Sequence, residues 1–270
     1  MSYLDTLSQE QKNNIATLVD ESKKAGITNP NTIAGMLAIV SKESSFVPKE
    51  EKSYAGTSNA RIKKVFGSRV GHLSDSELNS LKADPKRFFD TVYGGRNGNA
   101  ADEGYKFRGR GFNQLTFQGN YKKYGDLIGE DLVSNPNKVN NVRTAAKVLI
   151  AYNKAGIDSL KRKGKLKEYN ATDINDFKNT RDATLAFYHA TAGTGKSVSY
   201  VKGLANSDHL GGMTRALNRV NDLLTAVGTY VKKNPLKVIA LSALVVVATW
   251  VLIKYSGIGK KNKIIKTITN

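Results

Sequence analysis

The chain has 270 residues, of which 40% are hydrophobic, so it is long enough for one or two domains and apolar enough for a packed core. It contains no cysteine and only three histidines, which excludes a disulfide scaffold, a cysteine nucleophile and a thiolate metal site. We therefore expect no metal and no cofactor. The 42 Lys and Arg residues exceed the 23 Asp and Glu residues by 19. A surface of that charge fits nucleic acid, an anionic membrane or an anionic wall polymer.

Sequence patterns bear on the nucleic-acid alternative and on whether the chain carries a secretory signal. No nucleic-acid-reading motif accompanies the positive charge, so we expect no nucleic-acid partner. The first residues, MSYLDTLSQEQKNN, carry acids and amides where a secretory signal has a basic start and an apolar run, so we expect no signal of that kind.

Helical periodicity predicts a mainly α-helical domain over residues 1–225, with at most a small β element. The helical pattern is present near residues 8–25, 31–44, 75–91, 142–155 and 181–190. Strand-like alternation is weak, and no linker rich in Pro or Ser divides the segment. We read the run of basic residues at 161–167 as an exposed loop.

The predicted helix over residues 31–44 ends in a carboxylate. Its apolar positions recur at three- and four-residue spacing up to Val40, and Glu43 continues that stripe three residues later. A carboxyl group on a buried stripe is partly desolvated, which favours the protonated form that a general acid needs. Lys42 is one position away on the helix, so we expect it to point elsewhere. The alternative is a Glu that reaches solvent at a frayed helix end.

A second pair of carboxylates follows the end of this helix. Pro48 disfavours helical geometry in the residue before it, and Glu50 and Glu51 come next. Two carboxyl groups across a cleft, one protonated and one ionised, are the minimum that hydrolysis of a glycosidic bond requires. Glu pairs are common, so this spacing by itself also fits carboxylates with no shared role.

Residues 93–121 read YGGRNGNAADEGYKFRGRGFNQLTFQGNY and contain seven glycines. Glycine lets the backbone approach a ligand closely, and flat aromatic and amide side chains suit the faces and hydroxyls of sugars. The alternative is a long glycine-rich surface loop.

This segment resembles the signature of family 19 glycoside hydrolases, which include plant-type chitinases and many phage endolysins. The matching positions are Tyr105, Arg108, Gly109, Arg110, Gly111, Gln114, Leu115, Thr116, Asn120 and Tyr121. The upstream YGGRNGN is similar to a second pattern of the bacterial and phage branch. KESSF, at residues 42–46, resembles the helix-end pattern of the family's general acid, but has Lys for the usual His and one residue fewer before Phe46. The resemblance spans about residues 10–160.

The resemblance implies a lysozyme-like, two-lobed domain that hydrolyses β-1,4 bonds of an amino-sugar polymer with inversion. It implies Glu43 as the general acid, Glu51 or alternatively Glu50 as the base, and Thr116 as a ligand of the attacking water. Sugar contacts are expected from Tyr54, Tyr93, Arg110, Gln114, Asn120 and Tyr121. Arg108 and Arg110 fit a structural role equally well, and Asp102 and Glu103 are alternative bases.

A competing motif lies further along the chain. Residues 190–197, ATAGTGKS, fit a relaxed phosphate loop, in which Lys196 would bind phosphate and Ser197 magnesium. The residues before it indicate a helix where a phosphate loop follows a strand, which disfavours this reading. Residues 186–198, AFYHATAGTGKSV, which include this stretch, also resemble an element of lytic transglycosylases, which need one acid and leave 1,6-anhydro ends. A wall-binding protein without activity is a third alternative.

The C-terminal region differs from the rest of the chain. Residues 238–253 carry no charge, and the apolar segment extends over 236–255 if Lys237 and Lys254 direct their ammonium groups outward. We therefore predict a stalk at 226–235, a single-pass membrane helix at 236–255 and a basic tail at 256–270; a buried core helix is the alternative. An apolar stripe at 213–231 predicts a helix that packs on its own domain or, alternatively, on a second copy.

Together these observations predict a membrane-anchored enzyme of the endolysin type that degrades peptidoglycan rather than chitin. The absent export signal and disulfides, the basic surface and the endolysin-like motifs favour that substrate. We expect it in the membrane of a phage virion or of the infected bacterial host.

Overall fold

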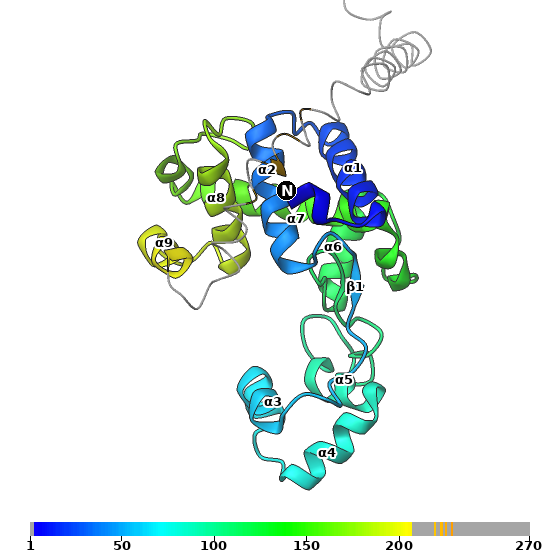
Figure 1. The fold of residues 1–270 in the computed structure, drawn as a ribbon. Helices are drawn as coiled ribbons and strands as arrows, with labels where there is room; N and C mark the ends of the chain where they lie inside the picture. Colours follow the sequence, from blue (N-terminus) through cyan, green and yellow to red (C-terminus); the bar gives the residue numbers. More distant parts are fainter. Residues whose placement is uncertain (1–2, 207–218, 220–221, 224, 226–227, 229–270) are drawn as a thin grey trace, which may run out of the picture. The chain divides into compact units, whose positions relative to one another are not determined.

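The computed structural model describes residues 3–206, 219, 222, 223, 225 and 228, and most of these residues lie in helices (Figure 1). The α-helices are α1 (Gln9–Lys24), α2 (Pro30–Glu43), α3 (Asn59–Phe66), α4 (Asp75–Ala83), α5 (Pro85–Tyr93), α6 (Gln118–Ile128), α7 (Val142–Arg162), α8 (Thr180–Ala192) and α9 (Val198–Asn206). Short 3-10 helices are η1 (Tyr3–Thr6), η2 (Gly67–Arg69), η3 (Pro136–Asn140) and η4 (Leu166–Tyr169). The predicted mainly α-helical class is confirmed.

Four predicted helices are confirmed as α1, α2, α7 and α8. The fifth, predicted over 75–91, is two helices, because Pro85 disfavours helical geometry at Asp84. Asp84 is extended and its side chain accepts a hydrogen bond from the backbone N–H of Arg87 at 3.1 Å, which begins α5. The pattern did not predict α3, α6 and α9, which are short.

The central helix α2 packs against α8, and α7 packs against α1, α6 and α8 (Figure 1). Every residue of α2 from Thr32 to Ser41 is buried. Gly35 permits the close approach to α8, since a Cβ there would lie 2.7 Å from the Cβ of Ala183. The helix is therefore buried around its whole circumference rather than along one stripe.

Helices α3, α4 and α5 enclose a hydrophobic core of their own, with buried residues Ile62, Val70, Leu78, Leu81, Phe88, Phe89 and Val92. Tyr54 and Tyr93 pack against this core with their rings, and the ring centroids of Phe89 and Tyr93 are 5.9 Å apart. A second cluster, around Phe107, Leu115, Tyr121, Tyr124, Leu132, Val139 and Val148, joins residues 107–121 to α6 and α7.

A two-stranded antiparallel sheet joins the segment after α2 to the glycine-rich segment. Its strands are β1 (Lys49–Glu50) and β2 (Arg110–Gly111), and Glu50 is paired with Arg110. The pairing continues for one more residue, because the N–H of Glu51 donates to the carbonyl of Gly109 at 2.9 Å. The two sequence segments that carry the family resemblance are thus hydrogen-bonded neighbours.

The chain divides into two units, Met1–Val227 and Gly228–Asn270. Among the described residues, no helix is long and apolar enough to cross a membrane. The predicted membrane helix at 236–255, the basic tail and the stripe positions of 213–231 lie outside those residues, as does the stalk apart from Gly228. Near the end of the first unit, the Asp222 carboxylate accepts a hydrogen bond from the N–H of Tyr3 at 2.6 Å.

Candidate active site

The turn after α2 connects Glu43 to β1 in a defined geometry. Ser45 and Phe46 both have a positive φ, +52° and +61°, and Phe46 is fully buried. Side-chain amides of α1 hold this turn, since Gln11 Nε2 donates to the Ser45 carbonyl and Asn14 Nδ2 to the Phe46 carbonyl, each at 2.8 Å. Two consecutive non-glycine residues in this conformation are unfavourable by themselves, so the surrounding contacts determine the turn.

Glu43 is more exposed than its sequence position predicted. Its side chain is 46% exposed, and its carboxylate forms an ion pair with the ammonium of Lys42. The predictions of a desolvated carboxyl group and of a Lys42 that points elsewhere are therefore wrong. Residues 32–41 of α2 are buried on all sides of the helix, so the position along the helix decides which side chains are exposed. Glu43 lies beyond the buried part, where α2 reaches the surface.

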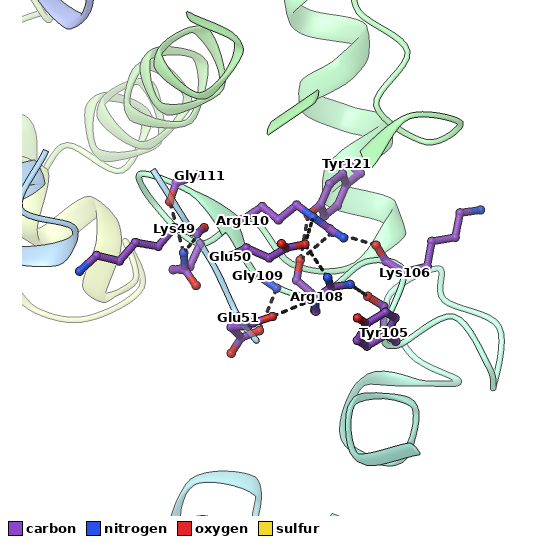
Figure 2. A network of polar contacts seen from close by, with 11 residues as sticks. Lys49, Glu50, Glu51, Tyr105, Lys106, Arg108, Gly109, Arg110, Gly111 and Tyr121 are labelled. Atoms are coloured by element: carbon purple, nitrogen blue, oxygen red, sulfur yellow. Dashed lines mark hydrogen bonds and ion pairs between the residues drawn. The ribbon is translucent and has the colours of Figure 1, made fainter. Parts of the chain in front are cut away.

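The Glu50 carboxylate lies between two arginines (Figure 2). Its Oε1 accepts from Arg108 Nη2 at 2.5 Å and from Arg110 Nε at 2.9 Å. The Arg110 side chain is only 2% exposed, and a buried cation of this kind requires a charged partner. Glu50 thus neutralises a buried arginine.

Tyr121 and Arg110 are not available to a sugar, so their predicted role in substrate binding is wrong. Tyr121 is fully buried; its hydroxyl donates to the Arg108 carbonyl at 2.8 Å and accepts from Arg110 Nη1 at 2.9 Å. Burial raises the pKa of Tyr121 to about 12, and the positive charge of Arg110 acts in the opposite direction. Both side chains hold the glycine-rich segment together from within.

The Glu51 carboxylate is held by three donors. It accepts from the hydroxyl of Tyr54 at 2.7 Å, from the hydroxyl of Tyr93 at 3.0 Å and from the N–H of Gly109 at 2.8 Å. Figure 2 shows the Gly109 bond beside the ion pairs of Glu50. All three partners donate, so the site is built for a carboxylate that accepts.

The tyrosine hydroxyls remain donors over a wide pH range. Burial is the largest cause that raises the pKa of Tyr54 and of Tyr93, and the charge of Glu51 raises both further. The sequence predicted both tyrosines as sugar contacts. It contained no signal for their hydroxyl bonds to Glu51, because Tyr93 lies 42 residues further along the chain.

Gly109 is required for this arrangement. A Cβ at this position would lie 2.9 Å from Glu51 Oε2 and 2.9 Å from Gln114 Oε1. A side chain at this position would displace the ends of the Glu51 and Gln114 side chains, so glycine leaves room for the backbone N–H to approach the carboxylate. The RGRG motif therefore supplies both the arginines that bind Glu50 and the glycine whose N–H bonds to the Glu51 carboxylate.

Three further predicted residues form a chain of hydrogen bonds after β2. Gln114 Nε2 donates to the Lys49 carbonyl at 2.8 Å, Thr116 Oγ1 to the Gln114 carbonyl at 2.9 Å, and Asn120 Nδ2 to the Thr116 carbonyl at 2.8 Å. Gln114 and Asn120 are exposed and Thr116 is half-buried. Their predicted roles toward sugar and water remain predictions. Of the alternative bases, Glu103 accepts from the N–H of Ala100 at 3.0 Å, and Asp102 is exposed.

The segment that resembled a phosphate loop connects two helices, α8 and α9. The carbonyl oxygens of Thr194, Gly195 and Lys196 all accept from Lys165 Nζ. A phosphate loop follows a strand and presents backbone N–H groups to its ligand. The surroundings of this segment therefore differ from those of a phosphate loop in both respects.

The predicted site residues do not line the cavity beside α1. This cavity, of about 490 Å³, lies among α1, α6 and α7 and includes Glu21, Leu127 and Lys154 in its lining. In the described part of the chain, no group of three or more His, Asp or Glu side chains could hold a metal ion.

Comparison with known proteins adds no relative: no protein-family model matches the chain, and no curated protein matches it. The resemblance to family 19 glycoside hydrolases therefore rests on the motifs themselves.

Proposed function

We propose that the chain is a glycoside hydrolase that cleaves β-1,4 bonds of peptidoglycan by inverting acid–base catalysis, on a lysozyme-like, two-lobed domain. The observation that carries the proposal is the setting of Glu51. Its carboxylate is fixed by three hydrogen-bond donors. An exposed carboxyl group, that of Glu43, lies eight residues earlier in the sequence, at the end of α2. The separate hydrophobic core of α3–α5 supports the two-lobed arrangement.

The proposed reaction uses each carboxyl group once. Glu43 gives its proton to the glycosidic oxygen as the bond between that oxygen and the anomeric carbon breaks. Glu51 takes a proton from a water molecule whose oxygen attacks the anomeric carbon from the opposite face. The sugar product has the inverted configuration, and proton exchange with solvent restores both groups.

The structure favours Glu51 over Glu50 as the base. Glu50 is bound to Arg108 and Arg110, and Arg110 is buried, so withdrawal of Glu50 would leave a buried positive charge without a partner. Glu51 has no basic partner among the described side chains; its bonds are to two hydroxyls and one N–H. It is the carboxylate that can accept a proton without disrupting an ion pair.

Lys42 adds a step to this mechanism. Its ammonium occupies the Glu43 carboxylate, which is also where the glycosidic oxygen has to bind. Because Glu43 is exposed, the ion pair opens at little cost. We therefore assign Lys42 as a group that the substrate displaces.

Peptidoglycan as the substrate and the membrane as the location complete the proposal. The net charge of +19 suits an anionic wall polymer, and the apolar run at 238–253 suits a single-pass anchor. We place the enzyme in the membrane of a phage virion or of the infected bacterial host.

A lytic transglycosylase is the second candidate, and one contact favours it. Lys42 Nζ lies 6.0 Å from the ring centroid of Tyr188, so the segment that resembles the transglycosylase element lies at the Glu43 end of α2. Such an enzyme needs only one acid, and Glu51 would then have no direct part in the reaction.

Product analysis distinguishes these candidates. Purified peptidoglycan is digested with the full chain, the fragments are identified by mass spectrometry, and the newly formed anomer is recorded by NMR before it equilibrates. Inverting hydrolysis gives reducing ends of inverted configuration, whereas transglycosylation gives 1,6-anhydro ends. Binding without release of fragments would overturn both candidates.

A further inference from the structure

Seven basic side chains come together where α7, η4 and α9 meet. We call them the basic cluster: Lys161, Arg162, Lys163, Lys165, Lys167, Lys196 and Lys202. Contacts between the three segments hold it in place. Lys163 Nζ donates to Thr194 Oγ1 at 2.8 Å, and Lys202 Nζ donates to the Glu168 carbonyl at 3.1 Å.

No ion pair within the described part of the chain compensates the charge of the cluster, although the carboxylate of Glu168 lies beside Lys167 in η4. Elsewhere on the surface, lysines such as Lys24, Lys86 and Lys122 form ion pairs with a carboxylate one helical turn away. None of the seven cluster residues forms an ion pair with a described residue; their contacts are to carbonyls, hydroxyls and rings. Such partners satisfy the donors and leave the positive charge in place.

A buried histidine lies under the cluster. The Nε2 of His189 is 3.1 Å from the Lys196 carbonyl, and its Nδ1 is 2.9 Å from the Tyr169 hydroxyl. Burial is the largest cause that lowers the pKa of His189, and the charges of Lys165 and Lys163 act in the same direction. The hydrogen bond with the Lys196 carbonyl and the charge of Glu168 raise this pKa, so His189 lies in the field of both the cluster and one carboxylate.

An aromatic ring accompanies the exposed lysines. Tyr200, on α9, is 52% exposed, and Lys196 Nζ lies 5.3 Å from its ring centroid. Lys161, Lys167 and Lys196 are exposed as well. An amphipathic ring beside long basic side chains is typical of surfaces that contact lipid headgroups.

We propose that the basic cluster and Tyr200 bind the anionic headgroup surface of a lipid bilayer. Lysine clusters of this size recognise anionic leaflets, where each lysine contributes about fivefold to partitioning. A nucleic-acid surface usually combines the charge with several stacking aromatics, whereas Tyr200 is the one exposed aromatic side chain that accompanies this cluster in the described residues. The proposal is independent of the proposed glycosidase activity.

The test measures partitioning of the full chain onto vesicles of phosphatidylcholine with and without phosphatidylglycerol. The cluster variant is Lys161→Gln/Lys167→Gln/Lys196→Gln. The control variant, Lys12→Gln/Lys64→Gln/Lys123→Gln, removes the same charge from exposed sites, and Lys123 is matched to Lys196 because its ammonium lies 5.1 Å from the Tyr124 ring centroid. The readout is the ratio of anionic to neutral partitioning, so insertion of the uncharged run 238–253 affects both terms equally, and the lysines of the predicted basic tail contribute the same amount in all three proteins.

We expect the cluster variant to lower this ratio at least tenfold and the control variant to change it less than twofold. The preference of the unaltered chain should also decrease as the salt concentration rises from 0.05 to 0.5 M, about a threefold shorter screening length. An equal loss in both variants, or none in either, would overturn the proposal. A cluster variant that keeps the vesicle preference but loses binding to single-stranded DNA would show that the partner is a polymer.

Discussion

The two carboxyl groups of the proposed pair lie in contrasting surroundings. At the end of α2, Glu43 is 46% exposed and, among the described residues, is paired with the flexible ammonium of Lys42. At the end of β1, Glu51 is half-buried and is bound by two tyrosine hydroxyls and a backbone N–H. One group is open to solvent and substrate, whereas the other is held by atoms from three different segments.

In the proposed mechanism this difference matches the different tasks of the acid and the base. A general acid has to meet a glycosidic oxygen, so an exposed helix end suits it, and its orientation can be completed by the substrate. A general base has to hold one water molecule in line with the anomeric carbon, so a rigid carboxylate suits it. Glu50, beside Glu51, is held more tightly still and serves the fold.

The largest expected effect on the cleavage rate comes from a substitution of Glu43, the more exposed carboxyl group of the proposed pair. Glu43→Gln keeps the shape of the side chain and removes the transferable proton, so we expect the rate of peptidoglycan cleavage to decrease about 10³-fold. Glu10→Gln, at an exposed position of α1, is the control and should leave the rate unchanged. Turnover is measured as the release of reducing ends. Normal cleavage by Glu43→Gln would remove Glu43 from the reaction.

The neighbouring carboxylates Glu50 and Glu51 should respond in opposite ways. Glu51→Gln should decrease the cleavage rate by about 10²- to 10³-fold; because the amide N–H faces a donor, it should lower the free energy of unfolding by about 1 kcal/mol only. Glu50→Gln leaves Arg110 without its charged partner and should lower the free energy of unfolding by about 3 kcal/mol. Urea denaturation and activity are measured on both variants. The reverse pattern would make Glu50 the base.

The free energy of unfolding should also depend on alkaline pH through Tyr121, the residue of α6 whose hydroxyl bonds to Arg110 of β2. The Tyr121 phenol loses its proton near pH 10 in the unfolded chain and, because burial raises its pKa, near pH 12 in the folded protein. Between these values the folded state holds more protons, so the free energy of unfolding decreases as the pH rises, by about 2 to 3 kcal/mol.

Tyr121→Phe tests this assignment. Between pH 10 and pH 12, the free energy of unfolding of this variant should decrease less than that of the unaltered chain. The difference between the two decreases is the contribution of the Tyr121 phenol. Identical pH dependence in both proteins, measured by urea denaturation at each pH, would show that Tyr121 does not cause the alkaline sensitivity.

The smallest expected effect concerns the donors to Glu51. Tyr93→Phe removes one hydroxyl from the carboxylate and keeps the ring packed on Phe89, so we expect about a tenfold decrease in kcat and little change in KM. The exposed Tyr200→Phe is the control, assayed with soluble glycan fragments. A large increase in KM would instead indicate that Tyr93 contacts the sugar, as the sequence predicted.

The sequence predicted the helices well wherever the hydrophobic pattern was long. α1, α2, α7 and α8 were found from periodicity, because a helix of 13 or more residues repeats its buried face several times. Short helices such as α6, which begins in the last residues of the glycine-rich segment, repeat it too few times to be recognised. The break at Asp84 was missed although Pro85 marks it.

The site was predicted less completely, because burial depends on neighbours that are distant in the sequence. The stripe argument placed Glu43 against the core, but α2 is covered on every side and Glu43 lies beyond the covered part. Tyr121 and Arg110 matched a motif and were read as sugar contacts. Their side chains point into the protein instead, toward Glu50 and the backbone of residues 106–108.

Composition and local pattern alone determined that this protein is mainly helical and strongly basic, and they drew attention to residues 42–54 and 93–121, since charge and periodicity are properties of neighbouring residues. The tertiary structure decided which glutamate forms ion pairs with arginines and which is held by two hydroxyls and a backbone N–H. It also gathered the basic cluster from three segments. Hydrogen bonds and ion pairs act over a few ångströms in space, and only the folded chain brings such distant residues within that range.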